Sequence, residues 1–251
     1  MPAPPPGRTQ SVPSSSEIHP LHAALNSPEK IDHAAAIYGW SAISDQFRKS
    51  WHGDAAIHFV RHGESLNNRL GLVTGKSDPP LTDSGRRQAQ SLRAMLVSGS
   101  VDLVISSTLR RARETMAIAL ASVPALKTSP YFDPRVNERS LGELENQPNR
   151  PVRGYARGDL DFAPEGGESY RTLAQRCFSF LIDLRAEVER SRQTRRLEVF
   201  VFSHVGPMRV FKAVYDKSVS SPAQMMAISF ENTMMLSCRG SNWHLPDYFI
   251  R

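Results

Sequence analysis

The sequence of 251 residues predicts an α/β protein in which a mostly parallel sheet is covered by helices on both faces, a three-layer αβα sandwich. Two observations carry this prediction. Apolar runs typical of strands buried on both faces occur at 55–60, 101–106 and 197–202. Segments with apolar residues at spacings of three and four, typical of amphipathic helices, follow each run.

The helices can be placed in chain order. They are predicted over 83–97, 108–121 and 168–190, and a fourth begins after residue 204. The third is the most regular, because Leu173, Cys177, Leu181 and Leu184 recur at helical spacing. Since strands and helices alternate, the strands are expected to run parallel.

Residues 1–54 are expected to form a separate N-terminal extension, and the domain itself is expected to span 55–251. The stretch 2–16 is rich in Pro and Ser and lacks large apolar side chains, so it is predicted to be disordered. Short helices are predicted within 28–51, starting at Pro28.

Composition restricts the classes of function. The chain has 31 Lys and Arg against 25 Asp and Glu, a net charge of +6, which suits an anionic substrate. Two cysteines, Cys177 and Cys238, are too few for a disulfide framework, and we expect buried thiols in a cytoplasmic protein. No apolar stretch reaches the roughly 20 residues of a membrane span, so no membrane partner is expected.

Polar side chains follow each predicted strand at its carboxyl end. These are Arg61 and His62 after the first strand, Ser106, Ser107 and the pair Arg110–Arg111 after the second, and Ser203 and His204 after the third. Because the carboxyl ends of parallel strands meet at one edge, the two histidines and two arginines are expected to converge there. Guanidinium groups and helix amino termini both bind phosphate, so the sequence predicts an anion site.

Six segments, in order, resemble the motifs of one family. They are Arg61–Asn68 (RHGE[ST]xxN), Thr74–Gly85 (TGxxDxPLTxxG), Ser107–Thr115 (SxLxRAxxT), Val136–Glu145 (the acidic block), Pro164–Ser169 (PxGGES) and Phe202–Gly206 (the second-histidine motif). On these motifs the chain resembles the histidine phosphatase superfamily, in the branch that contains cofactor-dependent phosphoglycerate mutases and many small phosphatases. The resemblance implies a phosphoglycerate mutase-like fold.

The resemblance also implies a mechanism and a set of residues. His62 would be the nucleophile that forms a phosphohistidine, and Glu138 would be the general acid and base. The remaining residues would bind the phosphoryl group or the substrate: Arg61, Arg111, His204, Asn68, Thr74 and Gly75. Neither a metal nor another cofactor is expected. Two positions depart from the family pattern, since Val205 and Asn146 stand where glycine is usual.

Phosphatase activity on a phosphorylated small molecule or a phosphoprotein is favoured over two alternatives, a phosphoglycerate mutase-type phosphotransferase and a non-catalytic phospho-ligand-binding module. Mutases of the family carry a long insertion after the acidic residue, whereas 29 residues separate Glu138 from Glu168 here. In this short cap, Arg150, Arg153 and Arg157 either bind a second anionic group or are simply solvated. Nucleic acid is not an expected partner, because the basic run 190–196 lacks aromatic residues. The sequence carries no indication of the oligomeric state.

Overall fold

The structure is a computed structural model that describes residues 37–97, 100–121, 123, 129–150, 153–191 and 195–250. The stretch 2–16 and the predicted helix that starts at Pro28 lie outside the described residues. Among the residues described, no helix is both long and apolar enough to cross a membrane.

Five strands form one sheet in the order β3-β2-β4-β1-β5. Their bounds are Ala55–Arg61 (β1), Leu103–Ser106 (β2), Tyr131–Phe132 (β3), Leu197–Ser203 (β4) and Met235–Arg239 (β5). The pairs β1–β4, β4–β2 and β2–β3 are parallel, and β5 runs antiparallel to β1. The mostly parallel sheet is thus confirmed, and all three predicted runs are strands of it.

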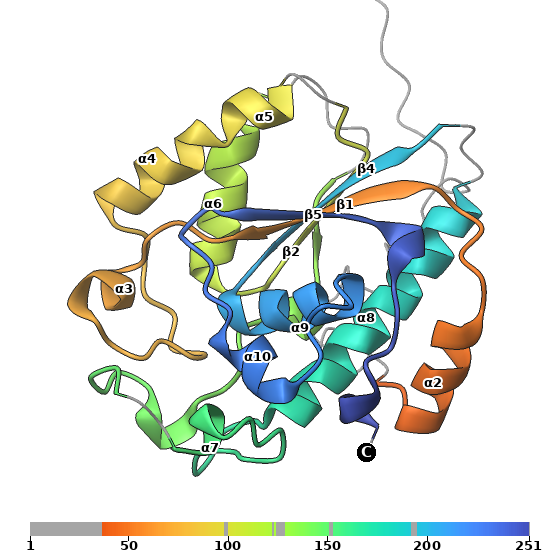
Figure 1. The fold of residues 1–251 in the computed structure, drawn as a ribbon. Helices are drawn as coiled ribbons and strands as arrows, with labels where there is room; N and C mark the ends of the chain where they lie inside the picture. Colours follow the sequence, from red (N-terminus) through yellow and green to blue (C-terminus); the bar gives the residue numbers. More distant parts are fainter. Residues whose placement is uncertain are drawn as a thin grey trace, which may run out of the picture. The chain divides into compact units, whose positions relative to one another are not determined.

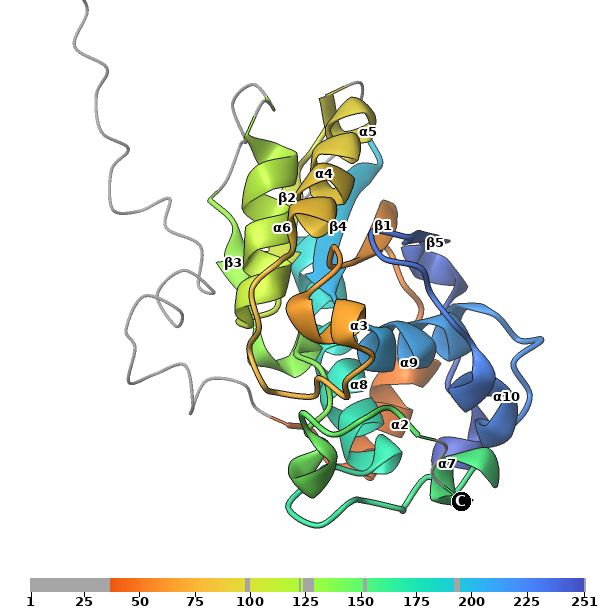
Figure 2. The ribbon, with the colours of Figure 1, turned by 90° about the vertical axis from the view of Figure 1, so that its left-hand side faces the viewer.

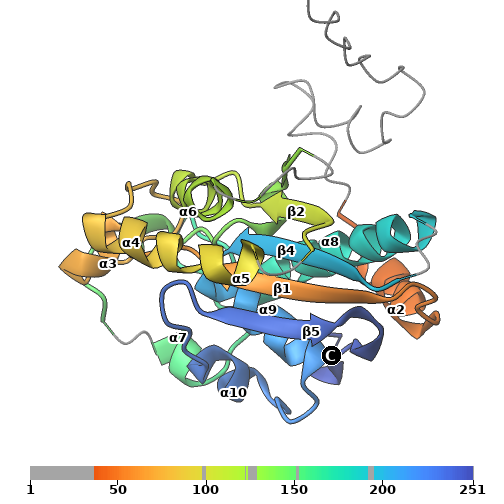
Figure 3. The ribbon, with the colours of Figure 1, turned by 90° about the horizontal axis from the view of Figure 1, so that it is seen from above.

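Helices cover both faces of the sheet, which confirms the three-layer arrangement (Figures 1 and 3). One layer contains α4 (Asp83–Ser91), α5 (Arg93–Val97) and α6 (Arg110–Leu120). The other contains α2 (Trp40–Arg48), α8 (Tyr170–Arg190) and α9 (Val205–Tyr215). The short elements are α3 (Leu66–Leu70), α7 (Arg153–Ala156), α10 (Pro222–Ala227) and the 3₁₀ turns Pro134–Val136, Gly142–Leu144, Gly240–Asn242 and Asp247–Phe249. The helix predicted over 83–97 is divided at Leu92, where α4 ends.

Successive residues of β1 enter different clusters, as the two-residue period of a strand requires. Ile57 and Phe59 belong to the larger cluster beneath α8 and α9, whereas Val60 belongs to the smaller one beneath α4, α5 and α6. Both faces of β1 are therefore covered near its carboxyl end.

The packed unit begins before the predicted domain start at residue 55. Residues 37–54 belong to it, because α2 packs on α8 and Ile43 and Phe47 are buried in the larger cluster. Residues 37–54 therefore pack with the domain, although the sequence assigns them to the extension. The signal was present, because Trp40, Ile43 and Phe47 recur at helical spacing along α2.

Candidate active site

The carboxyl ends of β1, β2 and β4 bring the predicted residues together. β1 ends at Arg61 and is followed by His62, and β4 ends at Ser203 and is followed by His204. The helices α6 and α9 begin at the same edge, immediately after β2 and β4. Figure 2 views the molecule from the side toward which these strand ends point, with α3 and α7 on that side.

The hydrogen bonds of His62 define its protonation state. Its Nδ1 lies 2.7 Å from the carbonyl oxygen of Gly63, which can only accept, so Nδ1 carries the proton. Its Nε2 accepts a hydrogen bond of 3.2 Å from Nε of Arg111, so Nε2 carries the lone pair. Burial, with the charges of Arg111 and Arg61, holds the pKa of His62 well below its usual value of 6.5. His62 is thus a neutral imidazole, and its Nε2, which carries the lone pair, faces Arg111.

Arg111 is completely buried and is held by backbone carbonyls. Its Nη2 donates to the carbonyl of Gly75 at 2.8 Å, and its Nη1 donates to that of Ser77 at 2.9 Å. Asp78 lies 3.8 Å from Nη1. Burial lowers the pKa of Arg111 to about 10, so the group remains a cation at neutral pH. Its orientation is fixed before any anion binds.

Arg61 is the second cation of the site. Its Nη1 donates to the carbonyl of Phe230, while its buried Nε has no hydrogen-bond partner among the described residues. Burial lowers the pKa of Arg61, whereas the charge of Glu138 raises it. A buried, unused N–H donor is costly unless a ligand binds it.

His204 is completely buried, and its ring lies 5.1 Å from that of His62, centroid to centroid. Its Nε2 lies 2.7 Å from Oγ of Ser107, while its buried Nδ1 has no partner among the described residues. Burial, with the charge of Arg111, holds the pKa of His204 well below its usual value. Nδ1 is therefore the ring atom left for a ligand.

Glu138 lies at the amino terminus of α9. Its Oε1 accepts hydrogen bonds from the backbone N–H of Gly206 at 3.1 Å and of Arg139 at 2.9 Å. A Cβ at position 206 would lie only 2.2 Å from that oxygen, so glycine is required for this close approach. The charge of Glu138 acts on both Arg61 and Arg111, which places the carboxylate beside the same site.

The predicted substrate-binding residues lie on the loops after His62. The side chain of Asn68 accepts from the backbone N–H of Ser65, which closes a capping box at the start of α3. Thr74 and Gly75 form a turn whose carbonyl groups bond Ser77 and Arg111, respectively. The Gly75 carbonyl thus holds Arg111, which is predicted to bind phosphate. That Asn68, Thr74 and Gly75 contact the substrate stays a prediction.

Sequence reasoning missed Arg176, a buried arginine on α8 that clamps the Glu138 loop. It forms two hydrogen bonds with Glu168, at 2.8 and 2.9 Å, and donates to the carbonyls of Arg135, Asn137 and Glu138. Glu168, from the PxGGES motif, therefore orients Arg176. The available signal was a charged residue three positions after Leu173, on the apolar face of its helix.

A segment before β5 was also missed, although it holds His62, the candidate nucleophile. The carbonyl of Met234 accepts from the backbone N–H of Arg61, and the N–H of Thr233 donates to the carbonyl of His62 at 3.3 Å. Thr233 has φ of 60°, a strained conformation for a β-branched residue. The strain is located where the chain supports the candidate nucleophile.

The short cap is attached beside Glu138. The guanidinium of Arg139 lies over two rings, those of Tyr155 from α7 and Tyr170 from α8, at 4.4 and 4.3 Å from their centroids. The two rings are perpendicular to each other, with centroids 6.0 Å apart. These cation–π contacts hold α7 against the residue next to Glu138. Arg150 and Arg157 are exposed.

The structure explains how the two unusual residues are accommodated. Asn146 has φ of 64°, in the left-handed region that glycine and asparagine tolerate best. Its Oδ1 accepts from Nδ2 of Asn67 at 2.8 Å, which adds a bond that glycine could not make. Val205, the first residue of α9, packs against the larger apolar cluster.

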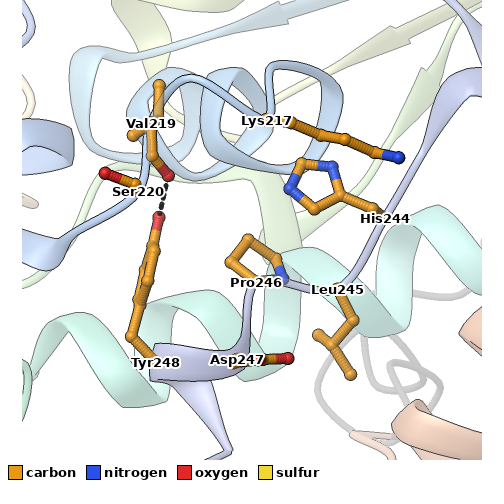
Figure 4. Close-up of a pocket in the computed structure, with 8 residues that line it drawn as sticks. All are labelled: Lys217, Val219, Ser220, His244, Leu245, Pro246, Asp247 and Tyr248. Carbon is orange, nitrogen blue, oxygen red and sulfur yellow. Dashed lines mark hydrogen bonds between the residues drawn. The ribbon is translucent and has the colours of Figure 1, made fainter.

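A cavity of about 390 Å³ lies at the other end of α9 (Figure 4). It is lined by Lys217, Val219, Ser220, His244, Leu245, Pro246, Asp247 and Tyr248. The hydroxyl of Tyr248 donates to the carbonyl of Val219 at 3.4 Å. No residue predicted for the site lines this cavity.

Two buried histidines, the buried Arg111 and the half-buried Arg61 lie at the carboxyl edge of a parallel sheet, an arrangement typical of α/β phosphoryl-transfer enzymes. The family model of the histidine phosphatase superfamily (branch 1) matches residues 57–247. The chain belongs to this superfamily.

Individual relatives include both phosphatases and mutases. A probable phosphoglycerate mutase GpmB of Proteus mirabilis is 33% identical over 144 residues, which cover 54% of this chain and 66% of that protein. The adenosylcobalamin/alpha-ribazole phosphatase of Escherichia coli is 29% identical over 178 residues, 68% of this chain and 82% of that protein. The structure of mycobacterial glucosyl-3-phosphoglycerate phosphatase with VO3 has a TM-score of 0.61 at 25% identity and covers 73% of this chain and 92% of that chain.

Proposed function

We propose that this enzyme hydrolyses a phosphomonoester through a phosphohistidine on Nε2 of His62. One observation carries the proposal: the Nδ1 proton of His62 is bound by the Gly63 carbonyl, which leaves the lone pair on Nε2 beside Arg111. A neutral imidazole with a fixed tautomer needs no deprotonation before it attacks phosphorus.

The phosphoryl group would be bound by N–H groups of the site that have no acceptor in the part of the chain that the structure describes. The buried Nε–H of Arg61 has no partner among the described residues, and three of the five N–H donors of Arg111 have acceptors there. His204 adds its Nδ1, and Asn68, Thr74 and Gly75 are proposed to contact the substrate from the loops. Cations whose positions are fixed before the substrate binds stabilise the charge that spreads over the phosphoryl oxygens.

Glu138 would transfer the protons in both steps. In the first, Nε2 of His62 bonds to phosphorus, the bond to the leaving oxygen breaks, and the Glu138 carboxyl gives that oxygen its proton. In the second, the Glu138 carboxylate takes a proton from water, the oxygen of that water bonds to phosphorus, and the electron pair of the P–N bond returns to His62. Inorganic phosphate is released.

Hydrolysis is favoured over mutase activity by the short cap. Only one short helix, α7, is described between Glu138 and Glu168, apart from a 3₁₀ turn. A small cap gives water access to the phosphohistidine. Relatives that are named phosphatases support this choice, and a small phosphorylated molecule or a phosphoprotein is the proposed substrate. The free thiols of Cys177 and Cys238 are consistent with a cytoplasmic location, which we also propose.

Phosphate release from a panel of phosphorylated metabolites and phosphopeptides tests the proposal. The His62→Ala variant should lose turnover, and the exposed His52 provides a matched control, His52→Ala, that should retain it. Trapping of acid-labile, base-stable radioactive phosphate on the wild type, but not on His62→Ala, would identify the intermediate. Equal turnover by His62→Ala would refute the covalent mechanism. Interconversion of phosphoglycerates without phosphate release would favour the mutase, and phosphate binding without turnover would favour the binding module.

A further inference from the structure

The hydrogen bonds around Ser107 are complete and have only one consistent direction. Its Oγ accepts from the backbone N–H of Leu109 at 3.1 Å and donates to Oδ1 of Asn137 at 2.8 Å. A hydroxyl oxygen has two acceptor sites and one proton. The bond to Nε2 of His204 must therefore be one that Ser107 accepts.

Asn137 cannot turn its amide to reverse this direction. Its Oδ1 also accepts from the backbone N–H of Thr108 at 2.8 Å, and its Nδ2 donates to Oγ1 of the same residue at 2.8 Å. A rotated amide would place an NH₂ group against that N–H donor. The backbone N–H of Thr108 therefore fixes the orientation of the Asn137 amide, and Oδ1 of Asn137 fixes the direction of the Ser107 hydroxyl proton. Because Ser107 can then only accept from His204, Nε2 of His204 must carry a proton.

A proton on Nε2 determines the state of the other ring nitrogen of His204, Nδ1. A neutral His204 with its proton on Nε2 has a lone pair on Nδ1, and Nδ1 is the buried atom that lacks a partner. A lone pair repels a phosphoryl oxygen, whereas an N–H attracts it. The neutral form of His204 that the network selects is thus unsuited to bind a fully deprotonated phosphate.

We propose that Asn137, acting through Ser107, is a positioning residue that holds the single proton of His204 on Nε2, so that a phosphoryl dianion binds only with the uptake of one further proton on Nδ1. The proposal rests on the proposed function, because it concerns the same phosphate site. The proton comes from solvent, or arrives with the substrate if the substrate is a monoanion. Either way the bound state contains an imidazolium that donates from Nε2 to Ser107 and from Nδ1 to the phosphoryl oxygen.

The charges around His204 agree with a proton that binds only with the anion. Arg61 and His62 face it from the end of β1, Arg111 from α6 and Arg176 from α8, and all four lower the pKa of His204 together with burial. Glu138 is the acidic group beside α9, through its bond to Gly206. Without an anion the surroundings are cationic and disfavour an imidazolium, and an anion reverses that balance.

Tungstate binding measures the proton directly, because tungstate is a phosphate-shaped dianion with no proton to bring at about pH 8. Calorimetric titrations in buffers of different ionisation enthalpy give the number of protons taken up. In Ser107→Ala, Nε2 loses its acceptor and the neutral ring is free to carry its proton on Nδ1. We expect this variant to take up about one proton fewer than the wild type.

Ser106→Ala is the matched control. Ser106 is the buried neighbour of Ser107, and its Oγ donates to the Ser107 carbonyl and not to the histidine. It should take up as many protons as the wild type. Comparing variants removes any contribution of His62 or Glu138, since both groups are present in all three proteins.

Ring ¹⁵N spectra of the wild type provide a measurement that needs no variant. His204 should have a protonated Nε2 and a bare Nδ1 in the free protein, and two protonated nitrogens with tungstate bound. A proton on Nδ1 of the free protein, or equal proton uptake by Ser107→Ala and the wild type, would overturn the proposal and leave the phosphatase intact. Failure of the wild type to bind tungstate would instead contradict the phosphate site itself.

Discussion

Nε of Arg111 donates to Nε2 of His62 across 3.2 Å, so the candidate nucleophile and its principal cation are bonded to each other. The contact orients the lone pair of His62 toward the place where Arg111 would bind the phosphoryl group. It also means that Arg111 must release Nε2 when that nitrogen bonds to phosphorus. The planar guanidinium suits this exchange, because its other N–H groups stay anchored to the Gly75 and Ser77 carbonyls.

Arg111→Lys is expected to reduce kcat/KM for a phosphomonoester by roughly a hundredfold or more, because an ammonium cannot replace the fork of N–H donors. Steady-state phosphate release gives the value. The neighbouring Arg110 provides the control Arg110→Lys, since its side chain pairs with Glu114 at 2.8 Å. Near-normal kcat/KM in Arg111→Lys would contradict the assignment of Arg111 to the phosphate site.

Stability is expected to fall as the pH decreases below about 6.5, because of His62 and His204. Both have lowered pKa values in the folded protein, so below that pH the unfolded chain binds protons that the folded protein does not. Their contribution to stability is thus present above the ordinary pKa of histidine and is lost as the pH falls. Each adds a slope of about 1.4 kcal/mol per pH unit to the free energy of unfolding.

Urea unfolding of His62→Gln and His204→Gln over that acidic range checks this origin. Each variant should lose about half of the slope that the pair produces, whatever its absolute stability. If both variants keep the slope of the wild type, the acid sensitivity has another source.

Gly206→Ala should impair catalysis more than stability. The new Cβ would meet Oε1 of Glu138 at 2.2 Å and push the carboxylate off the amino terminus of α9. A misplaced acid and base is expected to lower kcat roughly tenfold to a hundredfold. Alanine is favourable in a helix, so the free energy of unfolding should change by less than about 1 kcal/mol.

Gly39→Ala is the control for this substitution, because a Cβ there has nothing within 4 Å. It should retain wild-type kcat. A Gly206→Ala enzyme that is as fast as the wild type would show that the position of Glu138 does not limit turnover.

Asn146→Ala should be less stable than Asn146→Gly by about 1 kcal/mol, because alanine tolerates φ of 64° poorly. Both variants lose the bond from Asn67, so the difference between them isolates the backbone. Urea unfolding of the pair gives the value. Equal stabilities would mean that the left-handed conformation is not maintained in solution.

The strands that carry the site could be predicted because each is a continuous apolar run ended by polar residues. Ala55–Arg61 and Leu197–Ser203 lie at the centre of the sheet and are buried on both faces, so their hydrophobicity is unambiguous. β5 has no such pattern, because it is an edge strand with alternately exposed residues from Met235 to Arg239. Its pairing with β1 depends on tertiary structure, which a local pattern does not contain.

The site was predictable wherever a strand end or a motif placed a residue, and unpredictable where side chains pair over long separations. His62 and His204 follow from the parallel sheet, and the motif selects Arg111 over Arg110. The bonds of Arg176 to the carbonyls of Arg135 and Asn137, and of Asn137 to Ser107, join different elements and have no local signal. Such networks are determined by packing geometry, which only the folded structure provides.

The backbone of His62 is held by two residues that lie far along the chain: its N–H donates to the carbonyl of Ser203, and its carbonyl accepts from Thr233. During synthesis His62 is made early, whereas Ser203 and Thr233 are made late. The nascent chain therefore carries His62 without its active geometry until nearly the whole domain has emerged. A chain that ends before Thr233, through a nonsense codon or proteolysis, would contain the RHG motif. It would lack the hydrogen bond from Thr233 that holds the His62 carbonyl.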